Sequence, residues 1–211
     1  MTKKTFIPTF TSDDFEVLNK ESGYQGYFRL DKYQIRHRLF NGGWGDPVSR
    51  EVFERGKAAG ALLFDPDLNK IVLIEQFRMG ISTHTQYPWI LEIVAGIIEP
   101  NEKPEDVVRR ESEEEAGLTI KALLPIVEYW VSPGASSEKL SLFLAQVDAS
   151  DAGGIFGLAE EGEDIKVWTF TLDEAFQLVD DGKIINAPTL IALQWLRIHE
   201  AEVRRLWNVK V

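Results

Sequence analysis

The N-terminal stretch alternates apolar and polar residues and shows no helical period. Gly26–Phe40 alternates in this way and predicts a pair of long strands. Asn41, Gly42 and Gly43 form a strong turn signal, and Val48–Phe53 predicts a further strand. About fifty-five residues of this kind are too few to bury a core of their own. We therefore expect them to pack on the rest of the chain or on a second copy of it.

From Ala58 onward, short apolar runs are separated by turn residues and by segments that predict helices. The best-defined helix covers Pro104–Ala116, because Pro104 suits the first helical position and Gly117 suits the residue just past the end. Strands with a few helices among them indicate a layered α/β or α+β domain. The other predictions are strands over Ala61–Phe64, Ile71–Phe77, Trp89–Ile98, Ile120–Trp130, Lys139–Val147 and Asp164–Phe170, a loop over Ala149–Gly162, and helices over Leu172–Val179, Pro188–Arg197 and Glu200–Trp207.

Composition narrows the class of protein. The chain has 211 residues, no cysteine, and 23 Lys and Arg against 34 Asp and Glu, which gives a formal charge of −11. The lack of cysteine excludes disulfides, zinc–thiolate sites and thiol nucleophiles. Nucleic acids and anionic membranes are bound through cationic side chains, so we expect neither as a partner. A substrate with phosphates would need metal ions or the few arginines.

The N-terminal residues do not resemble a targeting segment. Met1–Phe10 carries two lysines with no apolar run behind them, so we expect no signal peptide. The apolar stretches of the chain are far shorter than a membrane span. We therefore expect a cytoplasmic protein.

The predicted helix over Pro104–Ala116 has an unusual face. An inward stripe begins with two valines and continues at helical spacing through Glu111, Glu114 and Glu115. Carboxylates at this spacing repel one another, and burying them is costly unless a cation lies among them. Hard oxygen donors without His or Cys suit Mg²⁺ or Mn²⁺ rather than zinc. Taken alone, a solvated acidic helix face would explain the same glutamates.

A glycine-led loop before this helix completes a longer motif. Its residues, at fixed spacings, are Gly96, Glu102, Arg110, Glu111, Glu114, Glu115, Gly117 and Leu118. This pattern resembles the signature box of the Nudix family of hydrolases. One position departs from the family, because the residue after Glu111 is usually aliphatic and here is Ser112. That position lies on the packing side of the helix, so we expect the carboxylates to be unaffected.

The resemblance extends over nearly the whole chain. Pro133 lies fifteen residues beyond Leu118, where Nudix enzymes that act on ADP-ribose carry a proline. Arg36–Gly42, Ile74–Gln76 and Leu190–Leu196 are similar to segments of the bacterial ADP-ribose-hydrolysing members. The resemblance implies hydrolysis of ADP-ribose to AMP and ribose 5-phosphate. Because the box does not discriminate among substrates, an ADP- or GDP-hexose remains an alternative, as does an inactive domain that senses a nucleotide.

The same resemblance implies a Nudix fold, in which a mixed β-sheet is sandwiched between α-helices and an antiparallel β subdomain precedes it. We expect an N-terminal subdomain for dimerisation and substrate binding over residues 1–55 and a catalytic domain over residues 56–211. The implied assembly is a homodimer with swapped N-terminal segments.

The resemblance also implies two or three Mg²⁺ ions, which Mn²⁺ could replace. The implied ligands are the backbone carbonyl of Ala95 and the carboxylates of Glu111, Glu115 and Glu163. A charge argument agrees, because a pyrophosphate brings further anionic oxygens that the glutamates can tolerate only with shared cations. Bound metal ions polarise phosphorus and lower the pKa of an attacking water, which makes Glu111 and Glu115 part of the catalytic machinery.

The general base is implied to come from a mobile loop outside the box. The resemblance assigns it to Glu161 in the acidic segment Leu158–Glu163, with Glu160 as a rival because sequence does not rank adjacent carboxylates. Taken alone, this segment is an acidic, solvated connection. A base on a loop could close over the substrate and exclude water. Within the box, we expect Glu102 to pair with Arg110 and fix the loop.

Substrate binding needs cations for the diphosphate and a stacking surface for adenine. Arg78 follows a buried strand and could hold a phosphate through its guanidinium group. Tyr27 and Phe28 could stack on adenine, which is worth about 1–3 kcal/mol in comparable cases, or could belong to a strand core. The resemblance implies that the partner subunit of a dimer contributes an adenosine site, formed by Tyr27, Phe28, Arg50, Glu51 and Arg55. It implies a site for the terminal ribose, formed by Ser132, Pro133, Gly134 and Glu138. It also implies that the backbone of Ile97 contacts the substrate.

Overall fold

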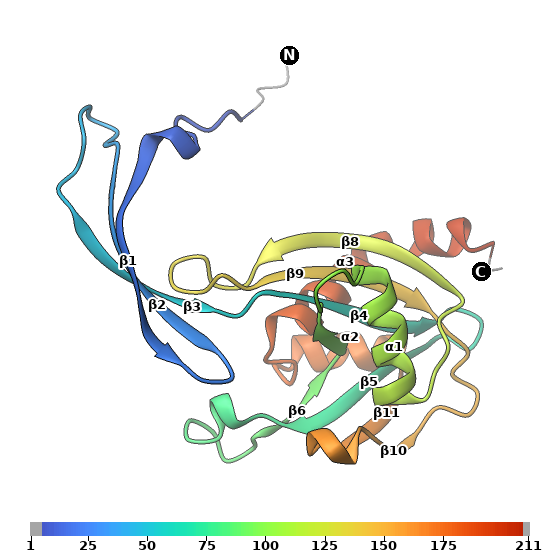
Figure 1. The fold of residues 1–211 in the computed structure, drawn as a ribbon. Helices are drawn as coiled ribbons and strands as arrows, with labels where there is room; N and C mark the ends of the chain where they lie inside the picture. Colours follow the sequence, from blue (N-terminus) through green and yellow to red (C-terminus); the bar gives the residue numbers. More distant parts are fainter. Residues whose placement is uncertain (1–5, 209–211) are drawn as a thin grey trace, which may run out of the picture. The chain divides into compact units, whose positions relative to one another are not determined.

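The computed structural model describes residues 6–208, and these form two compact units (Figure 1). The first unit contains the residues up to Arg55 together with Trp130–Glu138. The second contains Gly56–Tyr129 and the residues from Lys139 onward. The sequence pattern did not assign Trp130–Glu138 to the first unit, because this association is a long-range contact that local residue types do not encode.

The first unit is a three-stranded antiparallel sheet with the strand order β1-β2-β3. Its elements are a short 3₁₀ helix η1 (Ser12–Asp14) and the strands β1 (Phe15–Gln25), β2 (Arg29–His37) and β3 (Val48–Glu54). None of the hydrophobic side chains described in this unit is buried. Among the described residues of the unit, the one buried side chain is that of Asp31, which forms ion pairs of 2.9 Å with Lys20 and with Arg29. The described part of this unit therefore has a charged centre and no apolar core.

The predicted strand over Val48–Phe53 is confirmed, but the prediction for Gly26–Phe40 is partly wrong. The structure places one strand there, β2, and its partner β1 lies earlier in the chain. Nearly every residue of β1 is exposed. Because neither face of β1 is buried, its sequence lacks the alternation that predicts a strand.

The second unit is built around an eight-stranded mixed sheet. Its strands are β4 (Lys57–Asp65), β5 (Lys70–Phe77), β6 (Trp89–Glu92), β7 (Val94–Ile97), β8 (Ala122–Trp130), β9 (Lys139–Gln146), β10 (Gly154–Phe156) and β11 (Ile165–Thr171). The main path has the order β10-β11-β5-β4-β9-β8, while β6 pairs with β5 and β7 pairs with β4. β4 runs parallel to β9 and antiparallel to β5 and β7.

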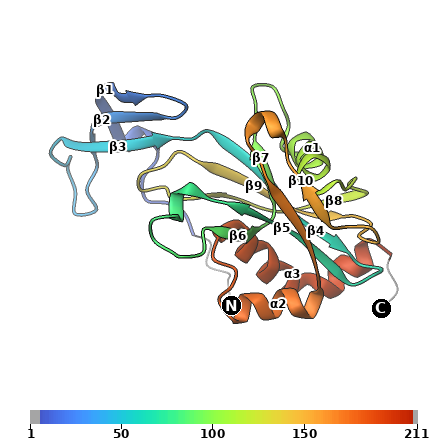
Figure 2. The same cartoon turned by 90° about the horizontal axis from the view of Figure 1, so that it is seen from below.

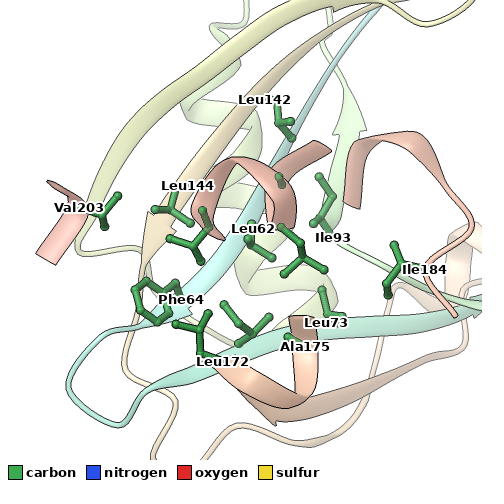
Figure 3. Packing of buried hydrophobic residues seen from close by; sticks show 14 of the residues in the cluster. Leu62, Phe64, Leu73, Ile93, Leu142, Leu144, Leu172, Ala175, Ile184 and Val203 are labelled. Carbon is green, nitrogen blue, oxygen red and sulfur yellow. The ribbon is translucent and has the colours of Figure 1, made fainter. Parts of the chain in front are cut away.

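Helices cover both faces of this sheet (Figure 2). α1 (Pro104–Ala116) packs on one face, and α2 (Leu172–Asp180) and α3 (Ala187–Leu206) pack on the other, where Figure 3 shows their apolar contacts. Alternate residues of β4 serve the two faces: Leu62 faces α2 and α3, and Leu63 faces α1. The predicted mixed sheet between helices is thereby confirmed. Two short 3₁₀ helices, η2 (Met79–Ile81) and η3 (Ala159–Glu161), lie in connections.

Three predicted boundaries in this unit are wrong. The two helices predicted over Pro188–Arg197 and Glu200–Trp207 form one helix, α3, because no Gly or Pro interrupts the chain between them. The apolar run Trp89–Ile98 forms two strands, β6 and β7, which break at Ile93. The predicted loop Ala149–Gly162 contains the short edge strand β10 and the 3₁₀ helix η3.

Among the described residues, no helix combines the length and hydrophobicity that a membrane crossing requires.

Candidate active site

α1 begins and ends where the sequence predicts. Gly117 follows the helix in the left-handed conformation, with φ of 66°, and its N–H donates to the carbonyl of Glu113 at 3.1 Å. Ser112 is fully buried, and its hydroxyl donates to the carbonyl of Leu118 at 2.6 Å. The polar residue at a usually aliphatic position therefore stabilises the end of the helix and leaves the acidic face unchanged.

Two glutamates of α1 are buried on the face that meets the sheet. Glu111 is 9% exposed and Glu115 is 2% exposed. The N–H of Ala95 in β7 donates to Oε2 of Glu115 at 3.0 Å. A Cβ atom at Gly96 would overlap the carboxylate of Glu111, so only glycine leaves room for that side chain. The motif glycine and the motif helix thus fit together around the two carboxylates.

These carboxylates lack enough positive charge around them. Burial raises the pKa of Glu115 to about 9, with repulsion from Glu111 and Glu163 adding to it and the N–H of Ala95 opposing it. Burial also raises the pKa of Glu111, which Arg110 at 2.8 Å opposes. A divalent cation would stabilise the ionised form of both groups. The oxygen-only donor set and its unmet charge therefore fit a hard divalent cation.

Arg110 joins the loop to the helix. Its Nη1 donates to Glu111 at 2.8 Å and to Glu114 at 2.9 Å, and its Nε lies 3.4 Å from Oε1 of Glu102. Glu102 in turn accepts a hydrogen bond of 3.1 Å from the N–H of Glu99. The predicted pairing of Glu102 with Arg110 is confirmed, and it fixes the loop before α1.

The acidic loop after β10 lies beside α1. The N–H of Gly157 donates to a backbone carbonyl of α1, that of Glu114, at 3.2 Å. Glu163 accepts a hydrogen bond of 3.1 Å from the N–H of Leu158 and raises the pKa of the two buried carboxylates by repulsion. Glu160 and Glu161, in contrast, are exposed. The structure thus brings Glu163 near the buried pair and leaves both candidates for the general base in solvent.

The predicted metal ligands stay a prediction. Within residues 6–208, no three or more His, Cys, Asp or Glu side chains are already gathered around a common metal position. What the structure offers is the buried pair Glu111 and Glu115 with the backbone of Ala95 beside it, and Glu163 nearby. Ile97, the predicted backbone contact, is the last residue of β7.

A second charged pair lies at the end of β5. Nε of Arg78 donates to Oε2 of Glu92 in β6 at 2.6 Å. Arg78 also lowers the pKa of Glu115 electrostatically, which places it near the buried carboxylates. Sequence reasoning identified Arg78 but missed Glu92, as well as the buried Gln76. The available signal was an acidic residue within the apolar run Trp89–Ile98.

In the first unit, four of the predicted substrate-binding residues lie together. The guanidinium of Arg55 lies over the ring of Phe28, 4.4 Å from its centroid, and its Nη2 is 3.3 Å from Oε1 of Glu138. Phe28 also contacts the ring of Tyr27, with centroids 4.7 Å apart, and Tyr27 is 84% exposed. These groups form a surface with aromatic, cationic and anionic parts.

The other predicted residues of this unit are exposed and are not gathered around that surface by hydrogen bonds. Arg50 and Glu51 are exposed on β3, and Nη1 of Arg50 donates to its neighbour's carbonyl at 2.8 Å. Ser132, Pro133 and Gly134 form an exposed turn, in which the carbonyl of Ser132 accepts backbone hydrogen bonds.

A cavity of about 610 Å³ lies elsewhere in the second unit. Its lining includes Trp89, Trp168, Phe170 and Leu178, of which Phe170 and Leu178 pack on the core beneath α2 and α3. None of the predicted site residues lines it. The cavity is therefore separate from the buried carboxylates, which lie on the opposite face of the sheet.

Comparisons with known proteins agree with this geometry. A model of the NUDIX domain matches residues 54–208. ADP-ribose pyrophosphatase of Escherichia coli (strain K12) is 48% identical over 208 residues, which cover 98% of this chain and 100% of that protein. ADP-ribose pyrophosphatase of Haemophilus influenzae is 42% identical over 205 residues, covering 96% and 94%. GDP-mannose pyrophosphatase of Yersinia enterocolitica is 31% identical over 185 residues, covering 87% and 95%.

A solved structure described as an ADP compounds hydrolase shares the fold, with a TM-score of 0.69 and 21% identity over 90% of this chain and 97% of that one. The mixed sheet, the motif loop and the carboxylate-bearing helix form an α+β domain. The chain belongs to the Nudix family, and it is a Nudix hydrolase.

Proposed function

We propose that this protein hydrolyses the pyrophosphate bond of ADP-ribose and releases AMP and ribose 5-phosphate. The observation that carries the proposal is the buried pair Glu111 and Glu115 on the family's motif helix. The pair occurs in a chain that is 48% identical, over almost its full length, to the ADP-ribose pyrophosphatase of Escherichia coli. A purely structural helix would have no reason to bury two carboxylates, because their burial costs free energy.

Divalent cations complete the proposed site. The carboxylates of Glu111, Glu115 and Glu163 and the backbone carbonyl of Ala95 would hold two or three Mg²⁺ ions, with Mn²⁺ as a substitute. Such ions, when bound, polarise the phosphoryl oxygens and lower the pKa of a bound water. The raised pKa of Glu115 supports this role, since the site lacks a compensating positive charge.

The remaining steps belong to the protein's own side chains. Arg78 binds oxygens of the diphosphate through its guanidinium group. Glu161 accepts a proton from the attacking water, whose oxygen bonds to one phosphorus as the bridging P–O bond breaks. Attack at either phosphorus gives the same two products. Glu161 is exposed in a short 3₁₀ turn, which suits a base that approaches when the loop closes over the substrate.

We also propose a cytoplasmic homodimer in which residues 1–55 contribute an adenosine site to the partner subunit. The first unit has no buried hydrophobic side chain among its described residues. Its exposed apolar residues could be buried by contact with a second copy of the chain. Phe28 and Arg55 offer a stacking surface for adenine, with the ring of Tyr27 against Phe28. Arg50 and Glu51, exposed on β3, would complete the adenosine site. Sedimentation at micromolar protein tests this, and a monomer would contradict it.

The direct test of activity is chromatography of AMP released from ADP-ribose by the purified protein with Mg²⁺. We expect turnover that a chelator abolishes and that added Mg²⁺ restores. If no AMP appears, the proposed activity is wrong. GDP-mannose is the second candidate, because the GDP-mannose pyrophosphatase of Yersinia enterocolitica is 31% identical to this chain. Comparing kcat/KM across ADP-ribose, ADP-hexoses and GDP-mannose decides between them.

A further inference from the structure

The ion pair between Arg78 and Glu92 joins two side chains of unequal exposure. The Arg78 side chain is 45% exposed and that of Glu92 is 15% exposed. The contact uses Nε of Arg78, 2.6 Å from Oε2 of Glu92. A guanidinium group has five N–H donors in a fixed plane, and within residues 6–208 the terminal nitrogens of Arg78 have no hydrogen-bond partner. The pair therefore fixes the inner edge of the guanidinium and leaves its outer edge available.

Glu92 occupies a position where packing would favour an apolar residue. It lies in β6 directly opposite Ile74 of β5, and Ile74 is fully buried in the core beneath α1. Burial raises the pKa of Glu92, and Arg78 opposes that rise. A carboxylate in such a place is unfavourable without a partner. The presence of Glu92 therefore needs a reason other than stability. Its partner is an arginine whose terminal nitrogens are available, which is the kind of group that binds anions.

The backbone of Arg78 is held as well as its side chain. Its N–H donates to the carbonyl of Pro88 at 2.9 Å, just after β5 ends at Phe77. Arg78 follows Ile74 and Gln76 at intervals of two residues, and Ile74 packs in the core beneath α1, so Arg78 starts from the face of the sheet that meets the buried carboxylates. Two separate contacts thus place one cation beside the proposed metal site.

The same corner contains a second donor without an acceptor. Gln76 is 7% exposed and precedes Arg78 by two residues, so the two start from the same side of the chain at the end of β5. Nε2 of Gln76 is buried and has no hydrogen-bond partner among the described residues. Buried donors of this kind are normally satisfied, so this corner of the site is short of an acceptor.

We propose that Glu92 is a positioning residue for the diphosphate. By holding Nε of Arg78, it sets the plane of the guanidinium so that the two terminal nitrogens form a fork for two phosphate oxygens. Bidentate contacts of this type are the strong and geometrically specific ones between arginine and phosphate. The inference rests on the proposed function, because it takes the substrate's diphosphate as the anion.

A double-mutant cycle tests this role. We expect Glu92→Ala to raise the KM for ADP-ribose about tenfold, the scale of a hydrogen bond to a charged group, with a much smaller change in kcat. In an Arg78→Ala background, the same substitution is expected to change KM by less than about twofold, because Glu92 acts through Arg78. If Glu92→Ala raises KM by the same factor in both backgrounds, the proposal is wrong.

Two further variants separate positioning from folding. Glu92→Gln keeps the volume and an acceptor oxygen, so it should restore part of the lost affinity, and it carries the test if the alanine variant unfolds. Glu75→Gln is the matched control, because Glu75 is also a carboxylate on β5 but has a different partner. Glu75 accepts a hydrogen bond of 2.8 Å from the indole N–H of Trp168. KM should be unchanged in this control. An equal increase in KM for Glu92→Gln and Glu75→Gln would contradict the proposal.

A readout that needs no turnover distinguishes failure of this inference from failure of the proposed function. The side-chain Nε–H signal of Arg78 in a nitrogen-correlated NMR spectrum, assigned by its loss in Arg78→Lys, should exchange slowly in the wild type and quickly in Glu92→Ala. Calorimetry with inorganic pyrophosphate and Mg²⁺ should show about tenfold weaker binding for Glu92→Ala. If the exchange rate and the pyrophosphate affinity change as expected but ADP-ribose is not hydrolysed, the positioning role is supported and the proposed substrate is wrong. Hydrolysis with equal exchange and equal pyrophosphate affinity would remove the positioning role.

Discussion

The two faces of the catalytic sheet are covered in different ways. α2 and α3 bury an apolar cluster that includes Leu172, Leu193 and Leu196. α1 also buries apolar residues, but it adds Glu111 and Glu115 to the same inner face. The first face gains free energy from the apolar residues it buries, whereas the second bears the cost of two desolvated carboxylates. The comparison indicates that both faces stabilise the domain through apolar packing, and that the α1 face in addition carries the proposed site.

Glu115→Gln should break this comparison most strongly. We expect kcat to fall by about 10³-fold or more, the upper range for loss of one electrostatic contact in a transition state, because the amide is a much weaker ligand for a divalent cation. The metal-free variant should keep its thermal unfolding midpoint. Steady-state kinetics and thermal denaturation measure both.

Glu113→Gln is the matched control for that substitution. Glu113 lies on the exposed side of the same helix. Glu113→Gln therefore changes the charge of α1 by the same amount as Glu115→Gln and leaves the buried face unaltered. Wild-type turnover is expected. If Glu115→Gln retains wild-type turnover, the assignment of the buried pair to metal binding is wrong.

Glu161→Gln sharpens the comparison within the site itself. We expect about a hundredfold loss of turnover, the lower range for removal of a general base, with unchanged Mn²⁺ affinity because Glu161 is exposed and apart from the buried pair. Glu160→Gln is the neighbouring control. A larger loss of turnover in Glu160→Gln would assign the base to that residue instead.

Leu193→Ala probes the opposite face. Leu193 is fully buried in α3, so its truncation should lower the free energy of unfolding by about 2–5 kcal/mol. Chemical denaturation measures this loss. At a temperature where the variant is folded, kcat should stay near the wild-type value; a hundredfold loss there would show that the two faces are not separable.

Ser112→Ala should give the smallest effect. Removing the hydroxyl that donates to Leu118 at 2.6 Å should lower the free energy of unfolding by about 1 kcal/mol. Turnover should be little changed, because Ser112 does not contact the carboxylates. A gain in stability would show that an aliphatic residue suits this position better.

The accuracy of the sequence predictions depended on how local the signals were. α1 was predicted with its observed bounds because Pro104 and Gly117 mark its ends within the sequence itself. β1 was missed because its exposed residues carry no alternation. The break at Ile93 depends on a hydrogen bond from its N–H to Thr189, which lies far along the chain.

The candidate site divides in the same way. The buried pair and the Glu102–Arg110 contact follow from spacing along one helix and its preceding loop. The contact between Arg78 and Glu92 joins two strands, and no single stretch of sequence contains it. The grouping of Phe28 with Arg55 is likewise a contact between distant segments.

The central claim is that the buried carboxylates of α1 hold divalent cations against a diphosphate. It is tested most directly by the anomalous density of crystals soaked with Mn²⁺ and a non-hydrolysable ADP-ribose analogue. We predict peaks roughly 2.0–2.3 Å from oxygens of Glu111 and Glu115, the range for hard cations bound to carboxylates, bridging to the diphosphate. Bound analogue with no anomalous peak at either carboxylate would contradict the account.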